Sequence, residues 1–99
     1  MDVTLVYFED CPNWLKADAH LRTLAAERPD LHITRRIVDT PEAAKETRFR
    51  GSPSILVDGH DIFADADAPV GLSCRVYQTP DGPAGSPTIE QLREVLSRG

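Results

Sequence analysis

The sequence predicts an α/β fold: a four-stranded mixed sheet with helices on both faces, in the order β-α-β-α-β-β-α. Three observations indicate this class. Strand-like hydrophobic runs alternate with helix-like amphipathic stretches up to residue 57, the Asp58-Gly59 pair marks a hairpin, and a last amphipathic stretch covers residues 88–98. Alternating strands and helices form parallel strands, and a hairpin adds an antiparallel one.

The composition indicates one soluble domain over residues 1–99. The hydrophobic fraction of 40% and the charged fraction of 27% are typical of globular proteins. The formal net charge of -5 disfavours nucleic acid and anionic membranes as partners. The first residues contain no basic region, and their apolar run is too short for a signal peptide or a membrane span. We therefore predict a cytoplasmic protein.

The first strand and the first helix are predicted within residues 3–25. The run Val3–Phe8 is continuously apolar apart from one threonine and too short for a core helix, so it predicts a strand buried on both faces. Pro12 suits the first position of a helix, because its ring fixes φ and a backbone N–H is not needed there. Apolar side chains then recur at helical spacing, at Trp14, Ala17, Leu21, Leu24 and Ala25.

The middle of the chain predicts two more strands and a short helix. A second strand is expected over residues 31–39, although Arg35-Arg36 interrupts its alternation. Thr40-Pro41-Glu42 combines a capping hydroxyl, a proline and an acid, so a short helix should begin there and end near Phe49-Arg50-Gly51. Ser54–Val57 predicts the third strand, and Asp61–Ala64 predicts its antiparallel return strand.

The last third of the chain is predicted to contain one long loop and one helix. Residues 65–85 show no regular element, and we interpret them as an inserted loop. Connections of this length are often functional, so we expect the loop to lie near the active site, whose candidate residues are described below. Thr88–Arg98 predicts the closing helix, capped by Ser86 or Thr88. Its apolar face consists of Ile89, Leu92, Val95 and Leu96.

Cys11 is the first candidate for chemistry, because it lies where the first strand gives way to the first helix. The unpaired N–H groups at a helix N-terminus stabilise a thiolate and lower its pKa from about 8.5. The adjacent acids Glu9 and Asp10 oppose that shift. The alternative is that Cys11 is a small buried side chain at the start of the helix.

Pro53 lies in Gly51-Ser52-Pro53-Ser54, directly before the third strand, where proline is tolerated at a strand start. The first strand, the helix opened by Cys-Pro-Asn-Trp at 11–14, and the hairpin opened by Pro53 together resemble the thioredoxin superfamily. The resemblance spans nearly the whole chain except residues 65–85, and it implies a thioredoxin-like fold. It further implies that Cys11 is the attacking thiol, that Pro53 is a cis proline beside the sulfur, and that Ser52 pairs its backbone with the substrate.

The chain departs from the Cys-x-x-Cys pattern of that family, because Trp14 occupies the position of the resolving cysteine. Trp14 either packs into the core or forms a wall of the thiol pocket. The resolving step then belongs to an external small thiol, belongs to Cys74, or is absent. The predicted topology returns the chain to the edge of the sheet at Cys11, so Cys74 could come within disulfide distance. The alternative is a Cys74 buried in a short apolar turn.

The remaining site candidates follow from the same resemblance and from charge. The expected substrate-binding residues are Pro12, Trp14, Ser52 and Pro53. Arg48 and Arg50 could pair with a carboxylate of a thiol cofactor such as glutathione, or they could be solvated charges at a helix end. No metal site is expected, because the cysteines and histidines are scattered. We expect no tightly bound cofactor, and a low-molecular-weight thiol is the candidate for reversible binding.

The predicted function is thiol–disulfide exchange, or reduction of a mixed disulfide, by Cys11, with Cys74 as the candidate resolving thiol. The partner would be a disulfide-containing protein or a small thiol, and the chain would be a monomer or weak dimer. Two alternatives stay open. One is a non-catalytic thioredoxin-like binding module, and the other is capture of a soft metal or an organomercurial by Cys11 and Cys74.

Overall fold

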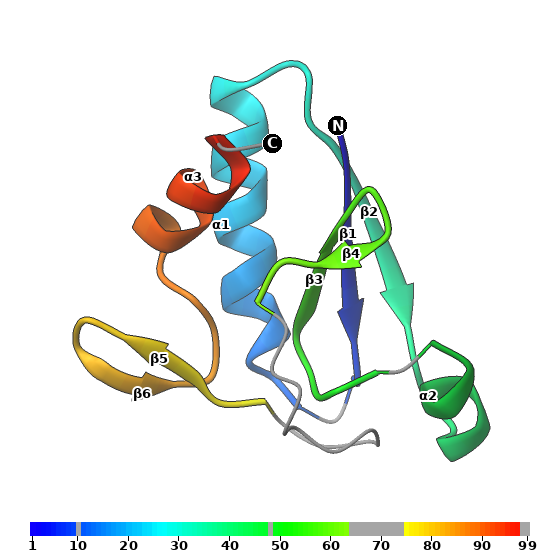
Figure 1. Ribbon diagram of the computed structural model, residues 1–99. Helices are drawn as coiled ribbons and strands as arrows, with labels where there is room; N and C mark the ends of the chain where they lie inside the picture. The colour runs from blue at the N-terminus through cyan, green and yellow to red at the C-terminus, as the bar shows by residue number, and fades with distance from the viewer. Residues whose placement is uncertain (10, 48, 64–74, 98–99) are drawn as a thin grey trace.

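The sheet of this protein has four strands and mixed directions (Figure 1). The computed structural model describes residues 1–9, 11–47, 49–63 and 75–97. The four strands are β1 (Asp2–Tyr7), β2 (His32–Ile37), β3 (Ser54–Val57) and β4 (His60–Asp61). Their spatial order is β2-β1-β3-β4; β1 and β2 are parallel, and β3 is antiparallel to both of its neighbours. The predicted four-stranded mixed sheet is therefore confirmed.

Helices cover both faces of the sheet, as predicted. The three helices within the described residues are α1 (Trp14–Glu27), α2 (Pro41–Thr47) and α3 (Ile89–Ser97). Figure 1 shows α1 and α3 together on one side of the sheet, and the short α2 beyond the end of β2. No helix in the described part of the chain is long and apolar enough to cross a membrane.

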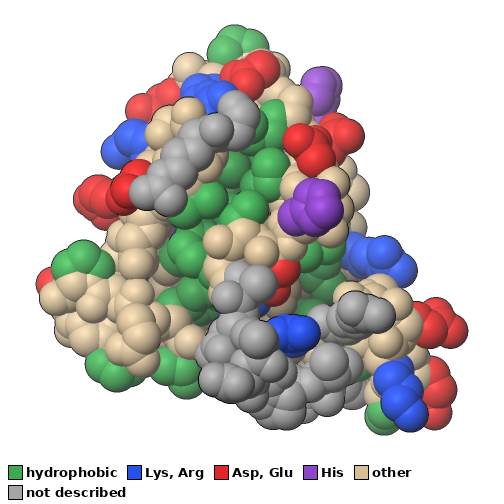
Figure 2. Space-filling view, viewed as in Figure 1, with side chains coloured by type: hydrophobic (Ala, Val, Ile, Leu, Met, Phe, Trp, Pro, Cys, Tyr) green, Lys and Arg blue, Asp and Glu red, His purple; other side chains and the backbone are tan. Residues whose placement is uncertain are grey.

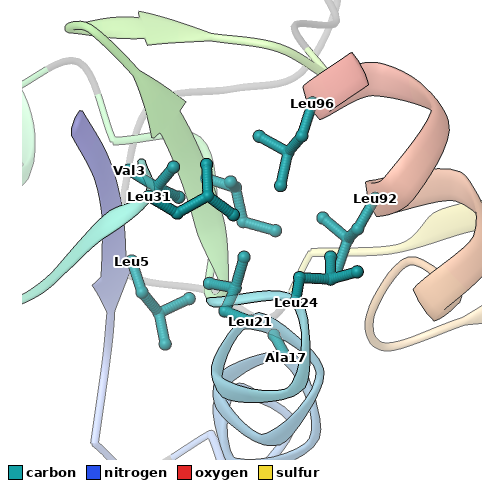
Figure 3. Packing of buried hydrophobic residues seen from close by; sticks show 9 residues of the cluster. Val3, Leu5, Ala17, Leu21, Leu24, Leu31, Leu92 and Leu96 are labelled. Carbon is teal, nitrogen blue, oxygen red and sulfur yellow. The ribbon is translucent and has the colours of Figure 1, made fainter. Parts of the chain in front are cut away.

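The main core lies between the sheet and the α1–α3 pair (Figure 3). Side chains alternate along β1, so Val3 and Leu5 face this layer while Val6 faces α2. The buried members of the main core are Val3, Leu5, Ala17, Leu21, Leu24, Leu31, Ile55, Leu92 and Leu96. Each large aliphatic side chain buried here contributes about 1.5–3 kcal/mol of transfer free energy. In Figure 2, hydrophobic side chains run between α3 and the β3–β4 hairpin, where this layer reaches the surface.

A smaller core lies on the opposite face, under α2. Its buried members are Val6, Val38, Ala44 and Phe49. Thr40 caps α2, because its Oγ1 accepts a hydrogen bond from the Ala43 N–H at 3.1 Å. The helix ends at Thr47, before the predicted end near residues 49–51. Because α2 is short, it covers only part of this face.

The start of α3 was predicted correctly, and the start of α1 was not. Thr88 caps α3: its Oγ1 accepts from the Gln91 N–H at 3.1 Å, and Gln91 Oε1 accepts from the Thr88 N–H at 2.9 Å. The expectation that Pro12 opens α1 is wrong, because the helix begins at Trp14. The Pro12 carbonyl instead accepts from the Leu15 N–H at 3.1 Å, which makes a tight turn before the helix.

The Arg35-Arg36 interruption in β2 has a structural explanation. The Arg35 guanidinium donates to both carboxylate oxygens of Asp18 on α1, at 2.9 and 2.5 Å. It also lies 5.3 Å from the ring centroid of Trp14. Arg35 therefore continues the α1-facing side of the strand as a paired charge, and Arg36 falls on the α2 side.

The prediction of no regular element over residues 65–85 is wrong for its second half. Tyr77–Thr79 and Gly82–Ala84 form a hairpin, β5 and β6. Thr79-Pro80-Asp81-Gly82 makes the turn, in which Gly82 has a φ of 104° and Thr79 Oγ1 donates to the Gly82 carbonyl at 2.6 Å. The central residues of this turn are Pro80 and Asp81, whereas Asp58 and Gly59 are the central residues of the β3–β4 turn, so the two hairpins use different turns. Residues 65–74 lie outside the described residues.

The return strand is shorter than predicted. It comprises His60–Asp61 only, whereas the sequence predicts residues 61–64. Asp61 Oδ1 accepts the N–H of Phe63 at 3.0 Å, so the chain turns directly after the strand. Ala64 lies outside the described residues.

Candidate functional site

Cys11 lies in the connection between β1 and α1, at the carboxyl end of β1. Its N–H donates to the Phe8 carbonyl at 3.0 Å, which closes a turn directly after the strand. The residue is 1% exposed, and its sulfur is in a disulfide bond. The other cysteine of the chain, Cys74, lies outside the described residues.

The turn before β3 brings Ser52 to the sulfur of Cys11. The distance from Cys11 Sγ to the Ser52 carbonyl oxygen is 3.7 Å. The Ser52–Pro53 peptide bond is cis, and both residues are buried. The Phe8 N–H donates to Ser52 Oγ at 2.9 Å, so the residue that follows β1 ties the Cys11 turn to the Ser52 turn. The structure thus brings Cys11 close to the Ser52–Pro53 turn, although Ser52 follows Cys11 by forty-one positions in the sequence.

Asn13 is a second contact of the sulfur that sequence reasoning did not identify. Its Nδ2 donates toward Cys11 Sγ at 3.6 Å. On its other side it meets Gly85: a Cβ placed on that glycine would lie 2.3 Å from the Asn13 side chain. Glycine at position 85 therefore allows the β6–α3 connection to hold the Asn13 amide against the sulfur.

Residues 75–77, which we call the strap, run along the outside of the Ser52–Pro53 turn. The Arg75 N–H donates to the Ser52 carbonyl at 2.9 Å, and the Tyr77 hydroxyl donates to the Pro53 carbonyl. Gly51 permits this close approach, because a Cβ there would lie 2.8 Å from the Arg75 Cβ. Gly51 also has a φ of 115°, which other residues rarely adopt.

The Arg75 side chain is buried and makes several polar contacts. It pairs with Asp61 at 2.8 Å, donates to Ser54 Oγ at 3.4 Å and donates to the Phe63 carbonyl. Its guanidinium also lies 4.8 Å from the ring centroid of Tyr77. Burial raises the pKa of the Tyr77 hydroxyl well above 10, and the nearby positive charge of Arg75 opposes part of that shift. The strap is therefore held by a buried charge and a neutral phenol.

The expected substrate-binding residues Pro12 and Trp14 have different environments. Pro12 is exposed. Trp14 is half-buried against the main core, and its ring stacks on Tyr7 with centroids 4.3 Å apart. Trp14 therefore packs against the main core with part of its surface and contacts Tyr7 and Arg35 with its ring.

Of the two arginines proposed for a thiol cofactor, the structure describes Arg50. Arg48 lies outside the described residues. Arg50 lines a cavity on the α2 side of the sheet, together with residues of β1, β2 and β3. The interpretation of Arg50 as part of a thiol-cofactor site stays a prediction.

The chemistry open to this site is that of sulfur. Within the described ranges, no group of three or more His, Cys, Asp or Glu side chains is arranged to hold a metal ion. The disulfide sulfur of Cys11 is surrounded by a carbonyl oxygen and an amide N–H donor. The two groups act on the sulfur in opposite ways, because the amide N–H of Asn13 attracts electron density and the carbonyl oxygen of Ser52 repels it.

Comparison with known protein families and with curated proteins finds no match for this chain. The geometry around Cys11 is therefore the basis on which we infer a function. Sequence reasoning missed Asn13, Arg75, Tyr77 and Gly85. The available signal was the position of Arg75 and Tyr77 directly after Cys74, together with a Pro-Asp-Gly turn that marks the hairpin behind them.

Proposed function

We propose that this protein is a thiol–disulfide exchange protein of thioredoxin-like fold, with Cys11 as the attacking sulfur and Cys74 as the resolving thiol. The observation that carries the proposal is the position of the Cys11 disulfide sulfur, 3.7 Å from the Ser52 carbonyl at the carboxyl end of β1. The order and directions of the four strands, with α1 and α3 on one face, are compatible with that fold. Sites in open α/β sheets gather at the carboxyl ends of strands.

The proposed reaction conserves atoms and electrons. The Cys11 thiolate attacks one sulfur of a substrate disulfide, forms a mixed disulfide, and releases the other substrate sulfur as a thiolate. The Cys74 thiolate then attacks the Cys11 sulfur, forms the protein disulfide and releases the remaining substrate thiolate. The substrate gains two electrons, which the protein dithiol loses, and an external thiol restores the dithiol. The substrate is a disulfide-containing protein or a mixed disulfide of a small thiol.

The strap bears directly on substrate access. The Ser52 carbonyl, which the resemblance assigns to substrate pairing, accepts the Arg75 N–H in this structure. A substrate that pairs with Ser52 must therefore displace Arg75. Since Arg75 directly follows Cys74, reduction of the disulfide removes a covalent restraint next to the segment that must move.

The burial of Cys11 favours a second candidate, a non-catalytic binding module whose disulfide is structural. A sulfur that is 1% exposed is not accessible to a large substrate without movement of its surroundings. In this case the reduced Cys11 thiol would have a pKa of about 8.5 or higher and would react slowly.

The reduction potential of the protein disulfide separates the two candidates. The oxidised protein is equilibrated in glutathione buffers of graded potential, and the disulfide fraction is counted by alkylation and mass spectrometry. A value between about −270 and −120 mV supports exchange, and a value below about −300 mV contradicts it. Digestion of the oxidised protein without reductant must also release a peptide that joins Cys11 to Cys74.

A matched pair of variants tests the two roles. In Cys74→Ser, the remaining thiol is expected to trap glutathione as a stable mixed disulfide; in Cys11→Ser, trapping is expected to be slower by at least about tenfold, since Cys74 is the resolving thiol. Equal trapping in both variants would show that Cys11 is not the attacking sulfur. Circular dichroism of both variants checks that they remain folded.

A further inference from the structure

The Arg75 end of the strap is anchored by a buried charge. The Arg75 side chain is 6% exposed, pairs with Asp61 at 2.8 Å and donates to the Phe63 carbonyl. Asp61 belongs to β4, so these contacts tie the strap to the β3–β4 hairpin and to the chain directly after it. Separation of a buried ion pair is strongly unfavourable, because it leaves a charge without compensation in a place that excludes water.

The Tyr77 end of the strap is anchored by a hydroxyl and a ring. The hydroxyl donates to the Pro53 carbonyl, and the ring meets that of Phe63 edge to face, with centroids 5.4 Å apart. The Arg75 guanidinium lies 4.8 Å from the centroid of the same tyrosine ring. No sulfur atom takes part in these contacts, so reduction of the protein disulfide removes none of them.

The closed strap fills the side of the Ser52 turn at which a polypeptide would lie. The Ser52 carbonyl oxygen is 3.7 Å from Cys11 Sγ and accepts the Arg75 N–H at 2.9 Å. The Arg75 Cβ also packs so closely on Gly51 that a Cβ there would lie 2.8 Å from it. A polypeptide disulfide carries backbone N–H and C=O groups on both sides of its sulfur, and these groups need space and hydrogen-bond partners beside the turn. Such a substrate therefore has to displace the strap.

A disulfide of two small thiols makes a smaller demand on the site. In the oxidised protein, the sulfur bonded to Cys11 covers one side of the Cys11 sulfur. Exchange proceeds by attack of a thiolate on a disulfide sulfur, so an incoming sulfur needs the space that the bonded sulfur held. A small thiol has no peptide chain on either side of its sulfur. Arg75 can therefore keep its hydrogen bond to Ser52 during the reaction.

We propose that the strap stays closed in the dithiol form of the protein and thereby directs Cys11 to disulfides of small thiols rather than of polypeptides. The inference rests on the proposed exchange function and selects one of its two substrate classes. The Cys11 thiolate bonds to one sulfur of the small disulfide, the bond between the two substrate sulfurs breaks, and one small thiol leaves as a thiolate. Cys74 then forms the protein disulfide and releases the second small thiolate, so the substrate gains the two electrons that the dithiol loses. Asp61 and Tyr77 are positioning residues, because they act through the strap.

Hydrogen exchange tests whether the strap stays closed. The Arg75 amide, which donates to the Ser52 carbonyl, is expected to be protected in the oxidised protein and to keep that protection within about tenfold in the reduced protein. NMR measures this amide in both forms of the full-length chain. A larger loss of protection on reduction overturns the inference, and this measurement does not depend on any exchange activity.

Two disulfides with the same leaving thiol test the selectivity. One is the disulfide of N-acetylcysteine amide, and the other is the symmetric disulfide of a short, uncharged, unstructured peptide with that cysteine at its centre. Each rate is divided by the rate of the same disulfide with glutathione alone, which corrects for intrinsic reactivity. The reduced protein is expected to react with the small disulfide at least about tenfold faster, the effect of one or two backbone hydrogen bonds.

Variants of the anchors connect the selectivity to the strap. Asp61→Asn weakens the anchor of Arg75 and is expected to raise the peptide rate at least about fivefold, while the small-disulfide rate changes less than about twofold. The matched control is Glu27→Gln, which removes an exposed pair with Arg93 and is expected to change neither rate. Tyr77→Phe keeps the ring and removes only the hydroxyl, and it is expected to raise the peptide rate about threefold.

The outcomes separate the selectivity from the exchange function. Equal corrected rates for the two disulfides overturn the selectivity, and so does an equal effect of Asp61→Asn and Glu27→Gln. If Asp61→Asn does not fold, an unchanged peptide rate in Tyr77→Phe overturns it. Absence of reaction with both disulfides instead overturns the exchange function on which the selectivity rests, while the Arg75 amide still reports whether the strap is closed.

Discussion

Two regions of this molecule are held together by different physical means. Among the described residues, nine buried aliphatic side chains form the centre of the layer between the sheet and the α1–α3 pair. The Ser52–Pro53 turn with its strap is held instead by a buried ion pair and by hydrogen bonds to backbone carbonyls. Hydrophobic contact is non-directional and tolerates small shifts, whereas each polar contact depends on one donor and one acceptor. We therefore expect the stability of the candidate site to depend more strongly on single polar side chains than the stability of the core beside it.

The largest expected effect is that of removing the buried charge of the strap. Arg75→Ala leaves Asp61 without its ion-pair partner and is expected to lower the free energy of unfolding by about 3–5 kcal/mol. Arg93→Ala is the matched control, because Arg93 pairs with Glu27 at the exposed surface; it should cost about 0.5 kcal/mol. Urea denaturation of the oxidised protein measures both. Equal losses would show that the strap is not held by its polar contacts.

Two leucine substitutions compare the closed and open faces of the sheet. Leu5→Ala, in the fully buried main core, is expected to lower the free energy of unfolding by about 3 kcal/mol. Leu56→Ala, half-buried at the cavity, should cost about 1 kcal/mol, since its side chain is already partly in contact with solvent. Thermal or urea unfolding measures the pair. A loss at Leu56 as large as at Leu5 would mean that the α2 face is packed as closely as the other face.

Alanine substitutions at Gly51 and Gly82 distinguish the cost of a positive φ from the cost of crowding by the strap. Both have positive φ, but only Gly51 is crowded, by the Arg75 backbone and Cβ, while nothing lies within 4 Å of a Cβ at Gly82. We expect Gly51→Ala to cost about 2 kcal/mol or more and Gly82→Ala about 1 kcal/mol. Unfolding experiments on both variants give the difference. If the two losses match, the approach of Arg75 to Gly51 contributes nothing.

The smallest expected effect is at Tyr77, and it depends on pH. Because burial raises the pKa of Tyr77 in the folded state, its contribution to stability is fully present below the unfolded pKa of about 10 and is lost as pH rises above it. Tyr77→Phe removes the hydrogen bond to the Pro53 carbonyl and should cost about 1 kcal/mol at neutral pH. The variant should also lose less stability than the natural chain between neutral pH and pH values above about 10. Parallel pH dependences would contradict this role for Tyr77.

The fold was predictable where the signal is local: a continuous apolar run for a strand, or a capping residue at the start of a helix. The apolar run at Val3–Phe8 predicts a strand that the structure has at Asp2–Tyr7, and Ser54–Val57 matches β3 residue for residue. Thr88 caps α3 as one of the two predicted alternatives. These features depend on local propensity and on side-chain periodicity, which a single sequence contains.

The candidate site was predictable only in part. Cys11, Ser52 and Pro53 were expected together from the resemblance, and the structure places the Cys11 sulfur beside the Ser52 carbonyl. Asn13 and Arg75 were not expected, because their contacts come from residues many positions away whose pairing has no periodic signal. The hairpin at 77–84 was missed although its Pro80-Asp81-Gly82 sequence is a recognised turn signal.

The sequence by itself determined which segments become strands and helices, and that Cys11 follows the carboxyl end of β1. Hydrophobic spacing and caps decide those properties locally, so they hold before the chain is folded. Only the tertiary structure decided that the Arg75 side chain is buried among Asp61, Ser54 and the Phe63 carbonyl, and that α2 leaves a cavity beside them. Such contacts form between distant segments and gain their strength from exclusion of water, which exists only after the chain has packed.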